Sequence, residues 1–329
     1  MDTVRRGEHV DPAKLILAEY LDRWEQGWAA LQVGPKTRER YVELLRLHVR
    51  PHIGALPLHK LQPVHLAELY AKLLSTGLSA RTVGHVHRCL HKALIVAVEW
   101  NLLARNPAAI AKPPKVQARE IEIITVEQAQ KLLRCLRGRA LHPIIMLALA
   151  TGMRRGELLA LRWCDVDLDA GTAQVARSLE QTKAGLRFKE PKTKHGRRSI
   201  KLSASVVAEL KAHWKQQQER RLKLGQGRAV EGDLVFPSWD GTVRSPNATT
   251  REWVRALAEF KLPAISLHAL RHTHASQLIA AGMDPVAISR RLGHASPTIT
   301  LNVYGHLFGN SDDRAAEIVE AAFGKTLTE

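Results

Sequence analysis

A segment rich in proline and lysine divides this chain into two parts of different character. It runs NPAAIAKPPKVQARE, from Asn106 to Glu120, and it has no apolar residues at helical spacing. Segments of this composition are extended and connect domains. The chain has 329 residues, which is more than one ordinary hydrophobic core accommodates. We therefore predict one domain at 11–110, a linker at 111–121 and a second domain at 122–310.

The part before the linker is predicted to be helical throughout. Its apolar residues recur at helical spacing, for example at Leu17, Leu21 and Trp24, which is typical of helices with one buried face. The helix expected over 79–101 also has a basic stripe on another side. This stripe is a candidate DNA-binding face, and its members are Arg81, His85, Arg88 and Lys92.

The part after the linker mixes helical and strand-like patterns. Thr125 and Gln128 have the spacing of a capping box, which marks the start of a helix. Further helices are expected after about Ser203 and Asn247. The strand candidates lie around 169–171, 186–188 and 198–200. The predicted fold class is therefore mainly α with a small antiparallel β-sheet.

The charge of the chain indicates a polyanionic partner. Lys and Arg number 49 against 32 Asp and Glu, which gives a formal net charge of +17. Nucleic acid is the first partner to consider, and the alternative is a basic enzyme with a solvated cationic face. The 3 cysteines include no C-x-x-C pair, which disfavours a disulfide framework and a cysteine zinc site.

Membrane insertion and export are not indicated by the sequence. The longest apolar run, from Pro143 to Ala150, is far shorter than the roughly 20 residues that a membrane-spanning helix needs. The start of the chain, MDTVRRGEHVD, has no apolar signal core. We expect a cytoplasmic protein without a membrane partner.

Three stretches place phosphate-binding side chains beside glycines. They are ATGMRRGEL at 150–158, PKTKHGRR at 191–198, and the segment from His268 to Tyr304. Two arginines, Arg154 and Arg271, can each donate two hydrogen bonds to phosphate oxygens and stabilise the charge of a pentacoordinate transition state. A tyrosine has a pKa near ~10, so attack by Tyr304 at neutral pH needs a cationic environment or a nearby base.

This residue set favours phosphate chemistry without a metal or ATP. It has no paired carboxylates, no evident metal cage and no G-x-x-x-x-G-K-[ST] loop. Attack by a phenol exchanges one phosphodiester for another and so preserves the bond energy for rejoining. Each fragment alone is more typical of an ion pair or a packing residue, and only their joint occurrence on a basic chain favours a reaction site.

The motifs ATGMRRGELLAL, KTK before RRSI, HALRHTHAS, RRLGH and NVYGH together resemble those of the tyrosine recombinase, or phage integrase, family. The resemblance covers nearly the whole chain. It implies a helical, SAM-like core-binding domain and a mixed α/β catalytic domain that form a two-domain clamp on DNA. It also implies site-specific cleavage and rejoining through a 3′-phosphotyrosyl intermediate, with no cofactor.

The same resemblance implies a role for each site residue. Arg154 and Arg271 bind and activate the scissile phosphate, and Tyr304 is the nucleophile. His268 hydrogen-bonds the phosphate and takes the phenolic proton, and His294 contacts a non-bridging oxygen. A lysine on a hairpin turn is the general acid for the departing 5′-hydroxyl. Lys192 best matches that place, and Lys194 is the alternative.

Other polar residues near the motifs have supporting or structural interpretations. Glu157 lies one helical turn from Arg154 and is expected to orient it rather than to act as an acid or base. His272 and His274 flank Arg271, and we interpret them as core and supporting residues rather than as a metal cluster with His268. The histidines and the cysteine of the 79–101 helix are likewise not interpreted as a zinc site.

The expected partner is double-stranded DNA with paired recombination sites, bound by a homotetramer. An excisionase or a host DNA-bending protein is the expected accessory partner. The segment 311–329 contains an amphipathic helix, which either packs on its own chain or docks on a neighbouring protomer. The helical pattern starts within the first fifteen residues, so we do not expect recognition of distant arm sites.

The motifs are compatible with more than one biological role. We predict an integrase that inserts or excises a phage or another mobile element. A resolvase-like recombinase that separates chromosome or plasmid dimers has the same residues. A type IB topoisomerase has a similar set but needs no paired sites. A catalytically silent DNA-binding relative is disfavoured by the completeness of the set.

Overall fold

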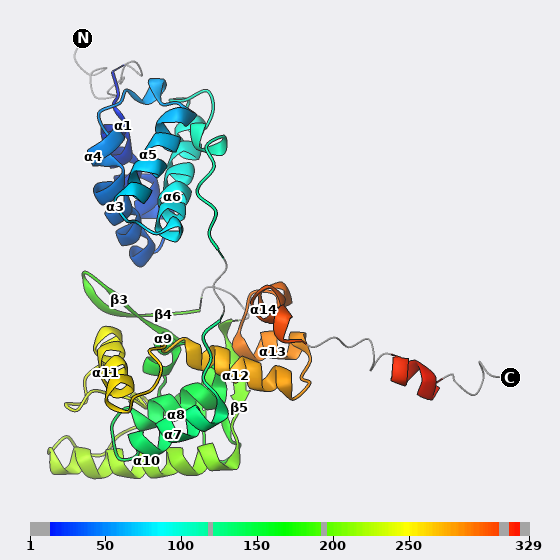
Figure 1. Ribbon diagram of the computed structural model, residues 1–329. Helices are drawn as coiled ribbons and strands as arrows, with labels where there is room; N and C mark the ends of the chain where they lie inside the picture. Colours follow the sequence, from blue (N-terminus) through cyan, green and yellow to red (C-terminus); the bar gives the residue numbers. More distant parts are fainter. Residues whose placement is uncertain (1–13, 118–120, 192–195, 309–315, 323–329) are drawn as a thin grey trace. The chain divides into compact units, whose positions relative to one another are not determined.

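The computed structural model describes residues 14–117, 121–191, 196–308 and 316–322. Contacts divide the chain into a first unit, Met1–Arg119, and a second unit, Glu120–Glu329. The described part is mainly helical with antiparallel sheets in the second unit, which confirms the predicted fold class (Figure 1). In this part of the chain, no helix has the length and apolar character that a membrane span requires.

The first unit is a helical bundle in which aromatic residues fill the core. Tyr20 is buried and donates a hydrogen bond to the Ala93 carbonyl at 2.5 Å, while Trp24 stacks on Trp28. Figure 1 shows the helices of this unit packed together, and they share one apolar core. The elements are α1 (Leu17–Gln26), α2 (Trp28–Gln32), α3 (Pro35–His48), α4 (Arg50–Ile53), η1 (Leu58–Lys60), α5 (Pro63–Ser75), α6 (Ala80–Glu99) and η2 (Pro107–Ala109).

Helix α6 confirms the helix predicted over 79–101. The Ser79 side chain caps it by accepting a hydrogen bond from the Thr82 N–H at 3.2 Å, which satisfies a backbone donor of the first turn. Its apolar side is buried against the other helices of the first unit. Burial of this face leaves the opposite face of α6 available for a partner.

The second unit begins with the predicted capping box. Thr125 and Gln128 exchange hydrogen bonds between side chain and backbone at 3.0 and 3.2 Å, as predicted. The helices expected after about Ser203 and Asn247 are also confirmed, as α10 and α11. The helical elements are α7 (Val126–Leu136), α8 (His142–Thr151), α9 (Arg155–Leu159), η3 (Trp163–Asp165), α10 (Ala204–Lys223), α11 (Pro246–Glu259), α12 (Ala269–Ala280), α13 (Pro285–Leu292), α14 (Pro297–Tyr304) and η5 (Gly305–Leu307).

The strands of the second unit form two small antiparallel sheets where the sequence predicts one. One sheet has the order β1-β2-β5, and the other is the hairpin β3–β4. Strand β4 is exposed along most of its length, and Figure 1 shows the hairpin beside α9 and α11. The strands are β1 (Val166–Asp167), β2 (Thr172–Val175), β3 (Ser178–Thr182), β4 (Gly185–Lys189) and β5 (Arg198–Lys201).

Helices α12, α13 and α14 pack together and share a small core of their own. Buried Ile279, Ile288 and Leu292 form this core with Tyr304, which is 1% exposed. Helix α12 also packs against α8 of the larger core (Figure 1). The packing therefore brings the end of α8, the start of α12 and the end of α14 into one region.

Some sequence predictions lie outside the described residues. They concern Lys192 and Lys194, the start of the chain, and the parts of the tail at 309–315 and 323–329. The described piece of the tail, 316–322, is helical.

Candidate active site

A cavity of about 520 Å³ in the second unit collects most of the predicted site residues. Its walls come from the segment before α9, from the ends of β3 and β4, and from α12 to α14. The predicted residues that line it are Arg154, Glu157, His268, Arg271, His294 and Tyr304. Residues that are up to 150 positions apart in the numbering thus meet in one place, as the motifs predicted.

Arg271 lies at the buried end of this cavity. It is 3% exposed, and its Nη1 donates a hydrogen bond to the Gly152 carbonyl at 2.8 Å. Its Nη2 is buried without a hydrogen-bond partner in the described part of the chain. Burial and the nearby charge of Arg154 lower the pKa of Arg271 to about 9, so the group stays cationic at neutral pH. A buried cation with an unused N–H is a binding position for an anion.

Gly152 fixes the backbone that holds Arg271. It ends α8 in the left-handed conformation with φ +65°. A Cβ at this position would lie 2.7 Å from Leu292 Cδ2 and 2.8 Å from His274 Cδ2, so only glycine lets α8 approach α12 and α13 this closely. The position of the Gly152 carbonyl, which accepts the hydrogen bond from Arg271, depends on that close approach.

Arg154 is oriented by Glu157, as the sequence predicts from their spacing. The Arg154 Nη1 lies 2.7 Å from Glu157 Oε1, and its Nη2 donates to the Gly293 carbonyl at 3.2 Å. The Arg154 side chain is 41% exposed, in contrast to Arg271. The two arginines therefore differ in environment, and Arg154 faces the open side of the cavity.

Glu157 also binds a second arginine that the sequence reading gave no role. Arg198 Nη2 lies 2.8 Å from Glu157 Oε2, and both side chains are buried. Burial by itself would raise the pKa of Glu157, but the hydrogen bond and charge of Arg198, together with Arg154, lower it below its usual range. The carboxylate therefore stays ionised and is shared between a structural arginine and a cavity arginine.

Tyr304 is buried, and its phenol contacts a histidine. The Oη of Tyr304 lies 2.8 Å from His272 Nδ1, and the two rings meet edge to face. Burial raises the pKa of Tyr304 to about 12, although the charge of Arg271 acts in the opposite direction. The phenol of Tyr304 is therefore protonated at neutral pH in this structure.

His268 and His294 complete the cavity as neutral imidazoles. His268 is the residue before α12, and desolvation and its cationic neighbours lower its pKa to about 4. Burial and the charges of Arg271 and Arg154 lower the pKa of His294 to about 4 as well. The Nδ1 of His294 lies 2.8 Å from Thr300 Oγ1, which leaves its Nε2 available to the cavity.

The other two histidines lie in different places, one in the scaffold and one at the cavity. His274 lies in the scaffold, since its Nδ1 lies 2.8 Å from the Leu149 carbonyl and its Nε2 accepts a hydrogen bond from Arg291 at 3.0 Å. His272 instead lines the cavity and contacts the tyrosine directly. The sequence contains a signal for the position of His272 at the cavity, because His268 and His272 are four positions apart and share a helix face.

The predicted general acids, Lys192 and Lys194, lie outside the described residues. Pro191 and Gly196, on either side of the segment that contains them, both line the cavity. Lys189 also lines it, but its ammonium is paired with Glu180.

The candidate DNA-binding residues of the first unit lie along α6, and most of them are exposed. Arg81, His85 and Arg88 are exposed, and Arg88 Nη2 lies 3.0 Å from His85 Nδ1. Lys92 is partly buried, with its ammonium 4.8 Å from the centre of the Trp28 ring. Desolvation and the charges of Arg88, Arg40 and Arg81 lower the pKa of His85. Over the residues that the structure describes, no group of three His, Cys, Asp or Glu side chains could hold a metal ion.

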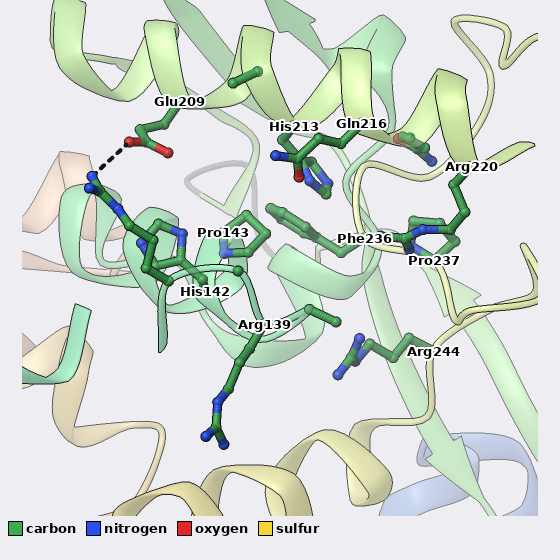
Figure 2. Close-up of a pocket in the computed structure, with 15 residues that line it drawn as sticks. Arg139, His142, Pro143, Glu209, His213, Gln216, Arg220, Phe236, Pro237 and Arg244 are labelled. Atoms are coloured by element: carbon green, nitrogen blue, oxygen red, sulfur yellow. Dashed lines mark ion pairs between the residues drawn. The ribbon is translucent and has the colours of Figure 1, made fainter. Parts of the chain in front are cut away.

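A second cavity, of about 320 Å³, lies between α10, the turn before α8 and the segment that precedes α11. Figure 2 shows His213 and Gln216 of α10 beside Phe236, with Arg139 and Arg244 on the opposite side. These two arginines are engaged by Glu259 and Glu252 respectively. Among the described residues, no tyrosine lines the second cavity, whereas Tyr304 lines the first.

Both parts of the chain match models of phage integrase domains. Residues 122–310 match the model of the phage integrase family, and residues 16–74 match the phage integrase N-terminal SAM-like domain. The chain is 27% identical to the "Tyrosine recombinase XerC-like" of Caldanaerobacter subterraneus subsp. tengcongensis, with 98% of this chain and 87% of the relative aligned.

Two solved structures share the fold. The Tn1549 transposon integrase in complex with a circular intermediate DNA has a TM-score of 0.78 at 23% identity, over 92% of this chain and 98% of that one. The lambda integrase tetramer bound to a Holliday junction has a TM-score of 0.64 at 20% identity, over 88% of this chain and 77% of that one. Since the family model covers more than half of the 329 residues, the chain belongs to the phage integrase family of tyrosine recombinases.

Proposed function

We propose that this protein cuts and rejoins DNA at specific sites, through a covalent bond between Tyr304 and a 3′-phosphate, to integrate or excise a mobile element. The observation that carries the proposal is the buried, unpartnered Nη2 of Arg271 in the cavity that Tyr304 also lines. A scissile phosphate supplies the anion that this N–H lacks. Membership of the phage integrase family supports the reaction class.

The cleavage step follows from the side chains of the cavity. The Oη of Tyr304 attacks phosphorus, the phenolic proton passes to a base, and the bond to the 5′-oxygen of the next nucleotide breaks. Arg154 and Arg271 hold the two non-bridging oxygens, and the charge they offset is greatest in the pentacoordinate transition state. His294 and His268 are neutral and add hydrogen bonds without a further charge. Rejoining is the same exchange in reverse and needs no ATP.

The leaving 5′-oxygen needs a proton from a general acid. We assign this role to Lys192, with Lys194 as the alternative, because the residues that flank their segment line the cavity. A 5′-bridging sulfur is a better leaving group and does not need the acid. Alanine at the true acid should therefore be rescued by the sulfur substrate, and alanine at the other lysine should not need rescue.

The domain assignment follows the predicted boundaries. We infer a core-binding domain at 11–110, a linker at 111–121 and a catalytic domain at 122–310. The basic stripe of α6 is the proposed DNA contact of the core-binding domain, since exposed cations at helical spacing match a row of phosphates.

We propose that assembly of the protein on DNA controls the reaction. Paired recombination sites held by a homotetramer are supported by the likeness to the lambda integrase tetramer. An excisionase or a host DNA-bending protein is the proposed accessory partner. In the tail, Ile318 and Val319 are 60% and 51% exposed, so the 316–322 helix has an apolar side that a neighbouring protomer could cover. Deletion of 311–329 should abolish pairing of sites while a single site is still cleaved.

A resolvase-like role is the second candidate, because a XerC-like recombinase is among the relatives. Such an enzyme separates joined copies of a replicon and uses the same chemistry. A plasmid with two copies of the site in direct repeat distinguishes the candidates. Equal activity without any element-encoded partner favours resolution, and dependence on an excisionase favours integration. A type IB topoisomerase would relax plasmids that carry no site.

The experiment that tests the proposed function recovers covalent protein–DNA adducts from cells that contain the protein and sequences the attached ends. The proposal predicts that the ends share one sequence and flank a mobile element. Adducts with random ends would contradict site-specific recombination, and the absence of adducts would contradict the reaction class.

A further inference from the structure

We propose that His272 is the base that takes the proton from Tyr304, which makes it a further catalytic residue. The proposal rests on the proposed function and assigns one step of it. Its basis is the contact of 2.8 Å between His272 Nδ1 and Tyr304 Oη, which joins α12 to α14 across the small core that these helices share.

The direction of this hydrogen bond follows from the burial of the phenol. Tyr304 is 1% exposed, and in the described part of the chain His272 is the hydrogen-bond partner of its Oη. If the imidazole were the donor, the phenolic hydrogen would be buried without an acceptor, which costs about 1–3 kcal/mol. The phenol therefore donates, and His272 carries its own hydrogen on Nε2 with Nδ1 as the acceptor.

The protonation states on the two sides of this bond suit a proton transfer. Burial raises the pKa of Tyr304 to about 12, so the phenol is protonated at neutral pH. Burial and the charge of Arg271 lower the pKa of His272, so its imidazole is neutral and ready to accept. The bond between Oη and phosphorus forms as the O–H bond breaks, and the proton goes to Nδ1. The resulting imidazolium returns this proton to the phenol when the DNA is rejoined.

His268, to which the family resemblance gives this role, is less well placed. Its ring packs edge to face against His272 with the centroids 4.8 Å apart. Between His268 and Tyr304, the described structure contains neither a hydrogen bond nor a ring contact. We assign His268 to the phosphate and to packing against His272, and not to the phenol.

The groups around His272 allow its charge to change during the reaction. Arg271 on the same helix disfavours the imidazolium, and Glu122 from the segment before α7 favours it. His268 packs against its ring, and Tyr304 is its contact on α14. The other elements packed against α12 carry His142 on α8, Arg290 and Arg291 on α13, and His306 on η5. The side chain of His272 is half-buried, so the imidazolium keeps some contact with solvent until it returns the proton to the phenol.

The test measures single-turnover cleavage of a nicked substrate by the full chain as a function of pH. In His272→Asn, the amide oxygen takes the place of Nδ1 and still accepts a hydrogen bond, but it cannot hold the proton. We expect cleavage at pH ~7 to fall by about 100- to 10,000-fold. The wild type should lose activity on the acid side, below the usual histidine pKa of 6.5, as His272 becomes protonated. His272→Asn should lack this acid limb and should gain rate as the pH approaches the pKa of the phenol.

Further variants separate a base from a residue that only positions the phenol. His272→Asn should not be rescued by a 5′-bridging sulfur, because that substrate relieves only the acid. His272→Ala should be partly rescued by added imidazole. Only a folded enzyme can be rescued, so this second variant separates loss of the base from a folding defect. His268→Asn should be slower than the wild type but should keep the acid limb.

Three results would overturn the proposal. They are a His272→Asn rate and pH profile equal to those of the wild type, a faster His272→Asn enzyme, and loss of the acid limb in His268→Asn but not in His272→Asn. Failure of the proposed function is distinguishable, because then the wild type itself would form no adduct with DNA.

Discussion

The buried carboxylate of Glu157 accepts a hydrogen bond from the buried guanidinium of Arg198 at 2.8 Å, and its other oxygen binds Arg154 at 2.7 Å. One carboxylate thus connects strand β5 to the arginine that faces the cavity. Arg198 is anchored further, since its Nε donates to the Arg291 carbonyl at 2.7 Å. The position of Arg154 therefore depends on an ion pair whose other arginine, Arg198, is not among the residues that line the cavity.

Glu157→Ala should destabilise the second unit and misplace Arg154. Removal of the carboxylate leaves Arg198 buried without its partner, which costs about 3–5 kcal/mol. Urea denaturation measures this change. The control is Lys211→Ala, which removes an exposed ion pair with Asp169 and should change stability by less than about 1 kcal/mol. Equal effects of the two variants would contradict a structural role of the Glu157–Arg198 pair.

The same ion pair gives stability a pH dependence. The pKa of Glu157 is lowered in the folded chain, so its stabilising contribution is present above the usual value of 4.5 and is lost as the pH falls through the lowered value. The stability difference between the wild type and Glu157→Ala should therefore shrink below that pH. If the stability difference between the two proteins stays constant down to acid pH, the ionised carboxylate of Glu157 is not what stabilises the wild type.

Gly152→Ala should lower the stability of the folded chain more than Gly138→Ala does. Both glycines have positive φ, +65° and +80°, but a Cβ at Gly152 meets Leu292 and His274 under 3 Å, while nothing lies within 4 Å at Gly138. The shared backbone strain costs about 1 kcal/mol, and the clash adds about 1–3 kcal/mol at Gly152 alone. Thermal unfolding of both variants checks this. Equal losses would mean that α8 and α12 can separate without penalty.

Arg271→Lys should slow DNA cleavage while DNA binding is largely retained. A lysine keeps the charge but cannot bind the Gly152 carbonyl and a phosphate oxygen with two fixed N–H groups. We expect single-turnover cleavage to fall by roughly 100- to 1000-fold. Arg139→Lys, at an exposed arginine of the second cavity, should cleave like the wild type. An active Arg271→Lys enzyme would rule out the bidentate role.

Arg88→Ala should weaken binding to every DNA sequence to a similar degree. An exposed cation on the α6 stripe that contacts a phosphate contributes affinity without base discrimination. Binding measured against salt concentration should lose about one unit of slope. Lys72→Ala removes an exposed cation of α5 outside the stripe and is the control. A change in sequence preference, with the salt slope unaltered, would place Arg88 at a base instead.

The sequence predicted the parts of this molecule that local patterns determine. Helix α6 and its capping Ser79 follow from apolar periodicity, and the capping box at Thr125 follows from two side chains three positions apart. The motif arginines were found for the same reason, since Arg154 lies in the short stretch ATGMRRGEL and Arg271 lies three positions after His268.

The contacts between distant segments were not predicted. Arg198 meets Glu157, and Tyr304 meets His272, only because separate elements pack together, and no local spacing encodes either pair. The division of the strands into two sheets is likewise a matter of pairing, which short strands do not reveal. The raised pKa of Tyr304 depends on burial in the small core that it shares with Ile288 and Leu292.

The proposed reaction joins Tyr304 covalently to DNA, so the residue that carries the DNA can be identified. The chain has 4 tyrosines, and the other three, Tyr20, Tyr41 and Tyr70, lie in the first unit. The protein is incubated with a nicked substrate that traps the cleaved state, the adduct is digested, and the peptide that carries the nucleotide is identified by mass spectrometry. We expect a 3′-phosphotyrosyl bond at Tyr304 and no adduct with Tyr304→Phe. An adduct at any other residue, or one that persists in Tyr304→Phe, would contradict it.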